Sequence, residues 1–115
     1  MESYKNRVSF DKRKSECERI MCKYTDRIPI IVNRTANCKL PMIDKEKFLV
    51  PSDMTLGQFI YVIRKRIKLD PNEALFILVN NTLQPSSAII VDIYEKLKDK
   101  DGFLYIHYSS ENTFG

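Results

Sequence analysis

Residues 47–67 read "KFLVPSDMTLGQFIYVIRKRI" and join a short strand to a helix. We predict a strand over residues 47–51 that ends at Pro51, since proline cannot donate a hydrogen bond to a neighbouring strand. Thr55 and Gln58 have the spacing of a capping box, which marks the start of a helix. The helix that follows carries its apolar residues on one stripe: Leu56, Phe59, Ile60, Ile63 and Ile67. A strand and a helix with one buried face therefore form the centre of the predicted fold.

Other elements are predicted on both sides of this segment. Residues 10–24 have the periodicity of an amphipathic helix, and residues 27–32 form a β-branched run typical of a strand. The run "ALFILV" at 74–79 is typical of a strand that is covered on both faces. Residues 89–97 are predicted as a short helix, and residues 103–108 as a closing strand.

The order helix, strand, strand, helix, strand, helix, strand indicates an α+β fold. Its layout resembles the ubiquitin-like β-grasp, in which a four-stranded mixed sheet wraps on a helix. Pro29 fits the strand at 27–32 only where that part of the strand leaves its amide unpaired. At 115 residues the chain is expected to form one compact domain.

The sequence contains no pattern of catalytic residues. It has no phosphate-binding glycine loop, no histidine pair for zinc and no nucleophile elbow, and His107 is its one histidine. Cys17, Cys22 and Cys38 lack metal-like spacing, and we expect them to be reduced thiols of a cytosolic protein. No apolar run approaches the roughly 20 residues that span a membrane. We therefore expect a protein that is not an enzyme and has neither a cofactor nor a metal.

The net charge of +4 is unevenly distributed. Basic residues are frequent in residues 1–27 and again in residues 64–68. Such patches could contact RNA, an anionic membrane or acidic peptides, although solvated helix faces are the ordinary interpretation.

Five segments together resemble one family, the GABARAP-like autophagy ubiquitin-like modifiers, and are nearest its fungal and protist members. They are "FDKRKSECERI" (10–20), "DRIPIIV" (26–32), "IDKEKFLVP" (43–51), "LGQFIYVIRKRI" (56–67) and "DKDGFLYIHYSSENTFG" (99–115). The resemblance extends from Phe10 to the last residue without an apparent gap. It implies a β-grasp core over residues 26–109, a helical extension with two helices over residues 1–25, and a flexible conjugation tail over residues 110–115.

The resemblance also implies a function as a covalent modifier. A cysteine protease exposes the C-terminal glycine, here Gly115, and Phe114 is expected to aid recognition of the tail. An activating enzyme and a conjugating enzyme then transfer the chain to the amine of phosphatidylethanolamine. The lipidated protein is expected on autophagosomal and vacuole- or lysosome-related membranes, and the free protein in the cytoplasm as a monomer. On the autophagosomal membrane it is expected to recruit cargo receptors and adaptors that carry aromatic-x-x-aliphatic motifs.

The resemblance further implies two pockets on opposite faces of the strand at 47–51. The aromatic pocket would be lined by Glu16, Ile20, Pro29, Ile31, Lys47, Leu49 and Phe103. The aliphatic pocket would be lined by Phe48, Val50, Pro51, Met54, Phe59, Val62, Ile63 and Arg66. A peptide strand could add to this edge, with side chains entering both pockets. The alternative is that the apolar members, such as Ile20, Leu49 and Phe59, are ordinary core residues.

Two other functions compete with conjugation. The first is a non-covalent ubiquitin-like adaptor that docks short linear peptides without being conjugated. The second is a small basic RNA-binding domain, but no strand carries an aromatic RNA-binding signature. We therefore expect no nucleic acid among the partners.

Overall fold

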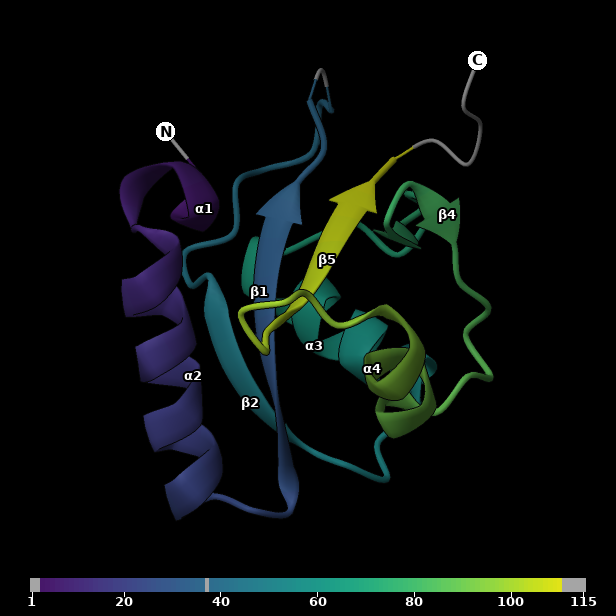
Figure 1. The fold of residues 1–115 in the computed structure, drawn as a ribbon. Coiled ribbons are helices and arrows are strands. Elements are labelled where there is room, and N and C mark those ends of the chain that lie inside the picture. The colour runs from purple at the N-terminus through teal and green to yellow at the C-terminus, as the bar shows by residue number, and fades with distance from the viewer. Residues whose placement is uncertain (1–2, 37, 111–115) are drawn as a thin grey trace.

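A mixed sheet with helices on both faces forms the fold (Figure 1). The computed structural model describes residues 3–36 and 38–110. Its helices are α1 (Tyr4–Arg7), α2 (Phe10–Lys23), α3 (Leu56–Ile67) and α4 (Ile90–Leu97). Its strands are β1 (Arg27–Arg34), β2 (Lys47–Pro51), β3 (Phe76–Val79), β4 (Thr82–Leu83) and β5 (Leu104–Ser109). The α+β β-grasp layout and the two N-terminal helices are confirmed.

The strand order is β2-β1-β5-β3-β4, so the described sheet has five strands where four were expected. The additional strand, β4, is only two residues long and pairs with β3 through a tight turn. Asn80 and Asn81 form this turn with φ of 51° and 61°. Two successive positive φ values are typical of a two-residue hairpin loop, and asparagine tolerates them well. The sequence indicated the turn, but not the short strand behind it.

The central pair, β1 and β5, is parallel, and the other pairs are antiparallel. Pairing between β1 and β5 begins at Ile30, so Pro29 is paired only with Leu49 of β2. A proline fits a strand where no hydrogen bond from its nitrogen is needed. Pro29 meets this condition on the side of β5, because pairing with β5 begins one residue later, at Ile30.

The capping box at the start of α3 is present. The Thr55 hydroxyl accepts a hydrogen bond from the Gln58 amide at 3.2 Å, and the Gln58 side chain accepts one from the Thr55 amide at 2.9 Å. The helix ends at Ile67, and the next residue, Lys68, caps it with a left-handed φ of 55°. Both ends of α3 are therefore fixed by interactions within a few residues.

Two hydrophobic clusters lie on opposite faces of the sheet. The larger contains Ile28 and Ile30 of β1 together with Phe59 and Ile63 of α3. The smaller contains four buried residues: Tyr4, Cys17, Ile31 and Phe103. Alternate residues of β1 enter alternate clusters because successive side chains of a strand point to opposite faces. Helices α1 and α2 thus pack on the sheet through a small core of their own.

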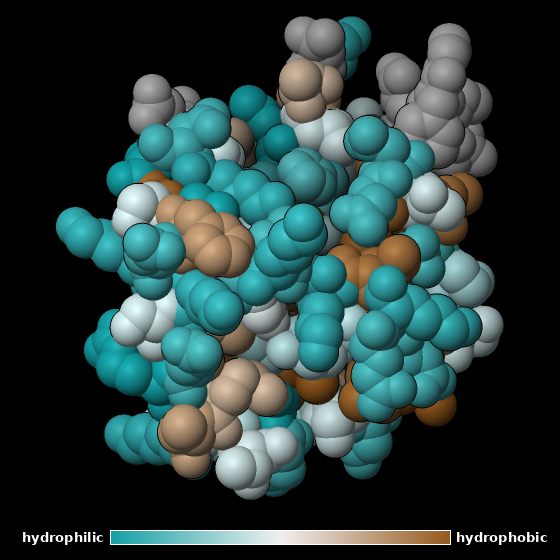
Figure 2. All heavy atoms as spheres, viewed as in Figure 1, coloured by the Kyte–Doolittle hydropathy of each residue, from teal (hydrophilic) through white to brown (hydrophobic). Residues whose placement is uncertain are grey.

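The outer surface is mainly hydrophilic on the face shown in Figure 2, where hydrophobic residues form small separate patches. Among the described residues, no helix is both long and apolar enough to span a bilayer.

Candidate functional site

Strand β2 lies at one edge of the sheet and pairs with β1 alone among the described strands. A strand in this position leaves one row of backbone amides and carbonyls without a neighbouring strand. Its side chains alternate between the faces, with Lys47 and Leu49 on one and Phe48 and Val50 on the other. The two predicted pockets therefore flank a single open edge.

The residues predicted for the aromatic pocket come together on the face covered by α2. Ile20 packs against the small cluster that contains Ile31 and Phe103, both almost completely buried. Ile31 is the register partner of Lys47, whose ammonium lies 2.6 Å from the carboxylate of Glu16. The remaining two, Pro29 and Leu49, are register partners of each other in β1 and β2.

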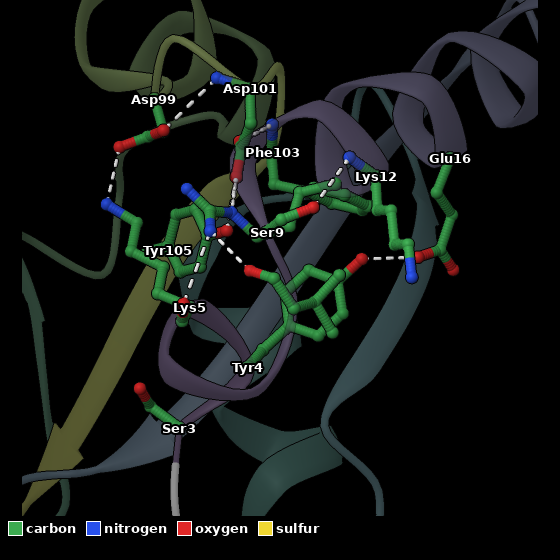
Figure 3. Close-up of polar contacts among 12 residues, drawn as sticks. Ser3, Tyr4, Lys5, Ser9, Lys12, Glu16, Asp99, Asp101, Phe103 and Tyr105 are labelled. Carbon is green, nitrogen blue, oxygen red and sulfur yellow. Dashed lines mark hydrogen bonds and ion pairs between the residues drawn. The ribbon is translucent and has the colours of Figure 1, made fainter.

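Tyr4 belongs to this group, and the sequence interpretation missed it. Its side chain is 1% exposed, and its hydroxyl donates a hydrogen bond to Glu16 (Figure 3). Its ring meets that of Phe103 edge-on at 5.6 Å, and the Lys47 ammonium lies 4.6 Å from its centre. Cys17, also buried in the small cluster, was missed as well. Ser3, whose side chain caps α1, is the one local signal that could have predicted a helix containing Tyr4.

The electrostatics of this group are dominated by Glu16. Partial burial would raise the pKa of Glu16, but hydrogen bonds from Lys47 and Tyr4 outweigh it and hold that pKa below its ordinary value. Burial, followed by the hydrogen bond to Glu16, raises the pKa of Tyr4. Glu16 is therefore an anion at neutral pH, and Tyr4 is a neutral donor.

A cavity of about 250 Å³ adjoins this group along α2. Glu16 and Ile20 line it together with Arg19, Lys23 and Tyr24. The two added basic residues give this part of the surface positive charge.

The residues predicted for the aliphatic pocket lie on the opposite face, between β2 and α3. Phe48 and Val50 are buried, and Phe59 and Ile63 have no exposed surface. These four belong to the larger core, as the alternative interpretation held, and Phe59 meets the Phe48 ring at 5.4 Å. The other four have accessible surface: Pro51, Met54, Val62 and Arg66. A side chain docking here would contact this second group above a floor of core residues.

Two cations stand over the ring of Phe48 at the border of this face. The ammonium of Lys45 lies 5.1 Å from the ring centre, and the guanidinium of Arg66 lies 5.7 Å from it. Arg66 also pairs with Asp44 at 3.0 Å. The Phe48 ring therefore lies beside two positive charges, one of which is already paired with a carboxylate.

The predicted tail residues Phe114 and Gly115 lie outside the described residues. The described chain reaches them through β5, the central strand, which ends at Ser109. Across residues 3–36 and 38–110, no group of three or more histidine, cysteine or acidic residues could hold a metal ion.

Comparisons with known proteins agree on one family. The family model described as "Autophagy protein Atg8 ubiquitin like" matches residues 12–115. "Autophagy-related protein 8" of Mycosarcoma maydis is 58% identical over 113 residues, which cover 98% of this chain and 96% of the relative. The protein of the same name from Kluyveromyces lactis is 57% identical, with 98% and 91% covered. The crystal structure of Trypanosoma brucei ATG8 superposes with a TM-score of 0.91 at 47% identity, covering 100% of this chain and 99% of that one.

Proposed function

Since this chain belongs to the Atg8 family of ubiquitin-like autophagy proteins, we propose that Gly115 is the residue through which it is conjugated to phosphatidylethanolamine. Conjugation to this lipid is the role of the family, whose members are modifiers and adaptors and not enzymes. Family membership over nearly the full chain is the observation that carries the proposal.

The composition of the tail supports Gly115 as the reactive residue. Glycine has no side chain to obstruct an enzyme that must approach the terminal carbonyl. Phe114, immediately before it, offers an aromatic ring that such an enzyme can recognise. A cysteine protease, an activating enzyme and a conjugating enzyme are the proposed partners of the tail.

Strand β2 is the proposed docking edge for aromatic-x-x-aliphatic motifs of cargo receptors and adaptors. Support comes from its position at the sheet edge. The residues predicted for the aromatic pocket lie on one face of β2, and those predicted for the aliphatic pocket lie on the other. Burying the aromatic or the aliphatic side chain of the motif contributes roughly 1.5–3 kcal/mol to the free energy of binding. After the cost of ordering the peptide, we expect micromolar affinity, about −8 kcal/mol.

The lipidated protein is proposed to lie on autophagosomal and vacuole- or lysosome-related membranes. Two acyl chains on one conjugated lipid are enough for stable anchoring.

Thioester formation tests the proposed conjugation. The purified chain is incubated with ATP, the activating enzyme and the conjugating enzyme, and a band that reductant abolishes is sought on a non-reducing gel. Vesicles containing phosphatidylethanolamine should then give a faster-migrating lipidated product. Gly115→Ala should greatly reduce both products, while Thr113→Ala, a change in the same tail, should retain them.

A chain that forms no thioester, where a known relative forms one, would be a non-covalent adaptor instead. Peptide binding at β2 would survive that result, so the two halves of the proposal are separable.

A further inference from the structure

The carboxylate of Asp101 is completely buried and accepts hydrogen bonds from three residues (Figure 3). The Phe103 amide donates to Oδ1 at 2.9 Å, and the Arg13 Nε donates to Oδ2 at 2.9 Å. The Tyr105 hydroxyl also donates to Oδ2. Asp101 thus joins helix α2 to the turn before β5 and to β5 itself.

The guanidinium of Arg13 extends the connection to helix α1. Its Nη1 donates to the carbonyl of Val8 at 2.7 Å and to that of Lys5 at 3.2 Å. One planar side chain therefore holds the buried carboxylate and the segment that joins α1 to α2. A lysine could pair with Asp101 but could not direct several fixed donors in this way.

Both ends of this connection reach the group proposed to bind an aromatic side chain. Phe103 follows Asp101 by two residues, and its ring packs against Tyr4 at 5.6 Å and Tyr105 at 6.4 Å. Tyr4 lies in α1, directly before Lys5, and donates to Glu16. The Arg13–Asp101 pair therefore fixes the backbone on both sides of the Tyr4–Phe103 contact.

The pair is better suited to fixing geometry than to stabilising the fold. A buried ion pair often contributes little net stability, since desolvation offsets the attraction between the charges. The larger core is on the other face of the sheet, whereas this pair adjoins the smaller cluster.

We infer that Arg13 and Asp101 are positioning residues for the aromatic-binding group. They hold the buried ring of Phe103 against the buried ring of Tyr4, and so set the position of the layer beneath the partly exposed Glu16, Ile20 and Leu49, which an incoming aromatic side chain would contact. This inference rests on the proposed docking function of β2.

Two peptides test the inference: one with the aromatic-x-x-aliphatic motif, and one in which alanine replaces the aromatic residue. Calorimetry gives the Kd of the alanine peptide divided by the Kd of the motif peptide. This ratio measures the contribution of the aromatic side chain alone. Arg13→Lys retains the positive charge beside Asp101 but loses the planar set of donors that also reaches the carbonyls of Lys5 and Val8. We expect this variant to reduce the ratio about tenfold. The alanine peptide should bind the variant as it binds the parent protein.

Arg7→Lys is the matched control, because Arg7 lies in α1 and pairs with Glu46 on the surface. It should leave the ratio unchanged. Tyr105→Phe removes the hydroxyl that donates a hydrogen bond to the Asp101 carboxylate, and it repeats the test with little risk to folding. We expect it to lower the ratio in the same direction and to speed hydrogen exchange of the Phe103 amide.

An unchanged ratio in folded Arg13→Lys and Tyr105→Phe would overturn the inference, as would equal weakening of both peptides. If the parent protein binds the two peptides equally, it is the docking proposal that fails. The parent measurement therefore separates the two failures.

Discussion

The ammonium of Lys47 lies 2.6 Å from the carboxylate of Glu16, so an ion pair joins the edge strand β2 to helix α2. The residues are 31 positions apart in the chain. Tyr4 donates to the same carboxylate from α1, and three separate elements therefore meet at Glu16. This contact fixes the distance between the edge strand β2 and the helices beside it.

Replacing Glu16 by glutamine should change how stability depends on pH. Its pKa is lowered in the folded protein, so its stabilising effect is complete above the unfolded value of about 4.5 and is lost as pH falls through the folded value. Urea unfolding at pH 7 and pH 3 should show that the free energy of unfolding falls less between these pH values for Glu16→Gln than for the parent protein. Identical acid losses would contradict this assignment.

Leu49→Ala should weaken binding of aromatic-x-x-aliphatic peptides at least about tenfold, the loss expected for removing a contact worth about 1.4 kcal/mol. Leu49 is half-buried on the proposed docking edge. The matched control is Leu83→Ala, since Leu83 is 40% exposed in β4 at the opposite edge of the sheet. Calorimetry that gives the parent affinity for folded Leu49→Ala would exclude this residue from the site.

Phe59→Ala should destabilise the protein by about 3–5 kcal/mol, because the ring is fully buried between α3 and the sheet. Tyr61→Ala, a neighbouring change at a side chain 58% exposed, should cost less than about 1 kcal/mol. Urea midpoints of the two variants give the comparison. Similar midpoints would mean that Phe59 does not belong to the core.

Gly102→Ala should destabilise the fold by more than about 1 kcal/mol for two reasons. Gly102 has φ of 96°, and a Cβ built there would lie 2.7 Å from the Cys17 sulfur. Adding Cys17→Ala removes the steric contact but leaves the backbone strain, so a double-mutant cycle should show coupling and incomplete recovery. If the losses of unfolding free energy for Gly102→Ala and Cys17→Ala are strictly additive, the contact between the new Cβ and the Cys17 sulfur does not destabilise the protein.

Local patterns predicted much of the fold correctly. The strand at 47–51 and the capping box at Thr55 depend on residues within a few positions of each other, and both occur as predicted. The run at 74–79 was predicted too long, since β3 covers only Phe76–Val79. The family resemblance supplied the two N-terminal helices, of which local periodicity alone indicated only the second. The division into domains stays a prediction.

The candidate site was predictable only in part. The resemblance proposed residues for the two groups, an assignment that stays a prediction, and alternation along β2 placed Lys47 and Leu49 opposite Phe48 and Val50. It did not distinguish core from surface, because Phe59 and Val62 look equally apolar in sequence yet differ in exposure. Burial depends on which neighbours cover a side chain, and those neighbours come from distant segments.

The sequence by itself determined the family, the order of most elements and the face on which each strand residue lies. These follow from motifs and from periodicity, which are properties of neighbouring residues. Only the tertiary structure decided that Tyr4 joins Glu16 and Phe103, and that Arg13 meets Asp101 across 88 positions. Such pairings form when the sheet brings remote segments into contact, so no local pattern encodes them.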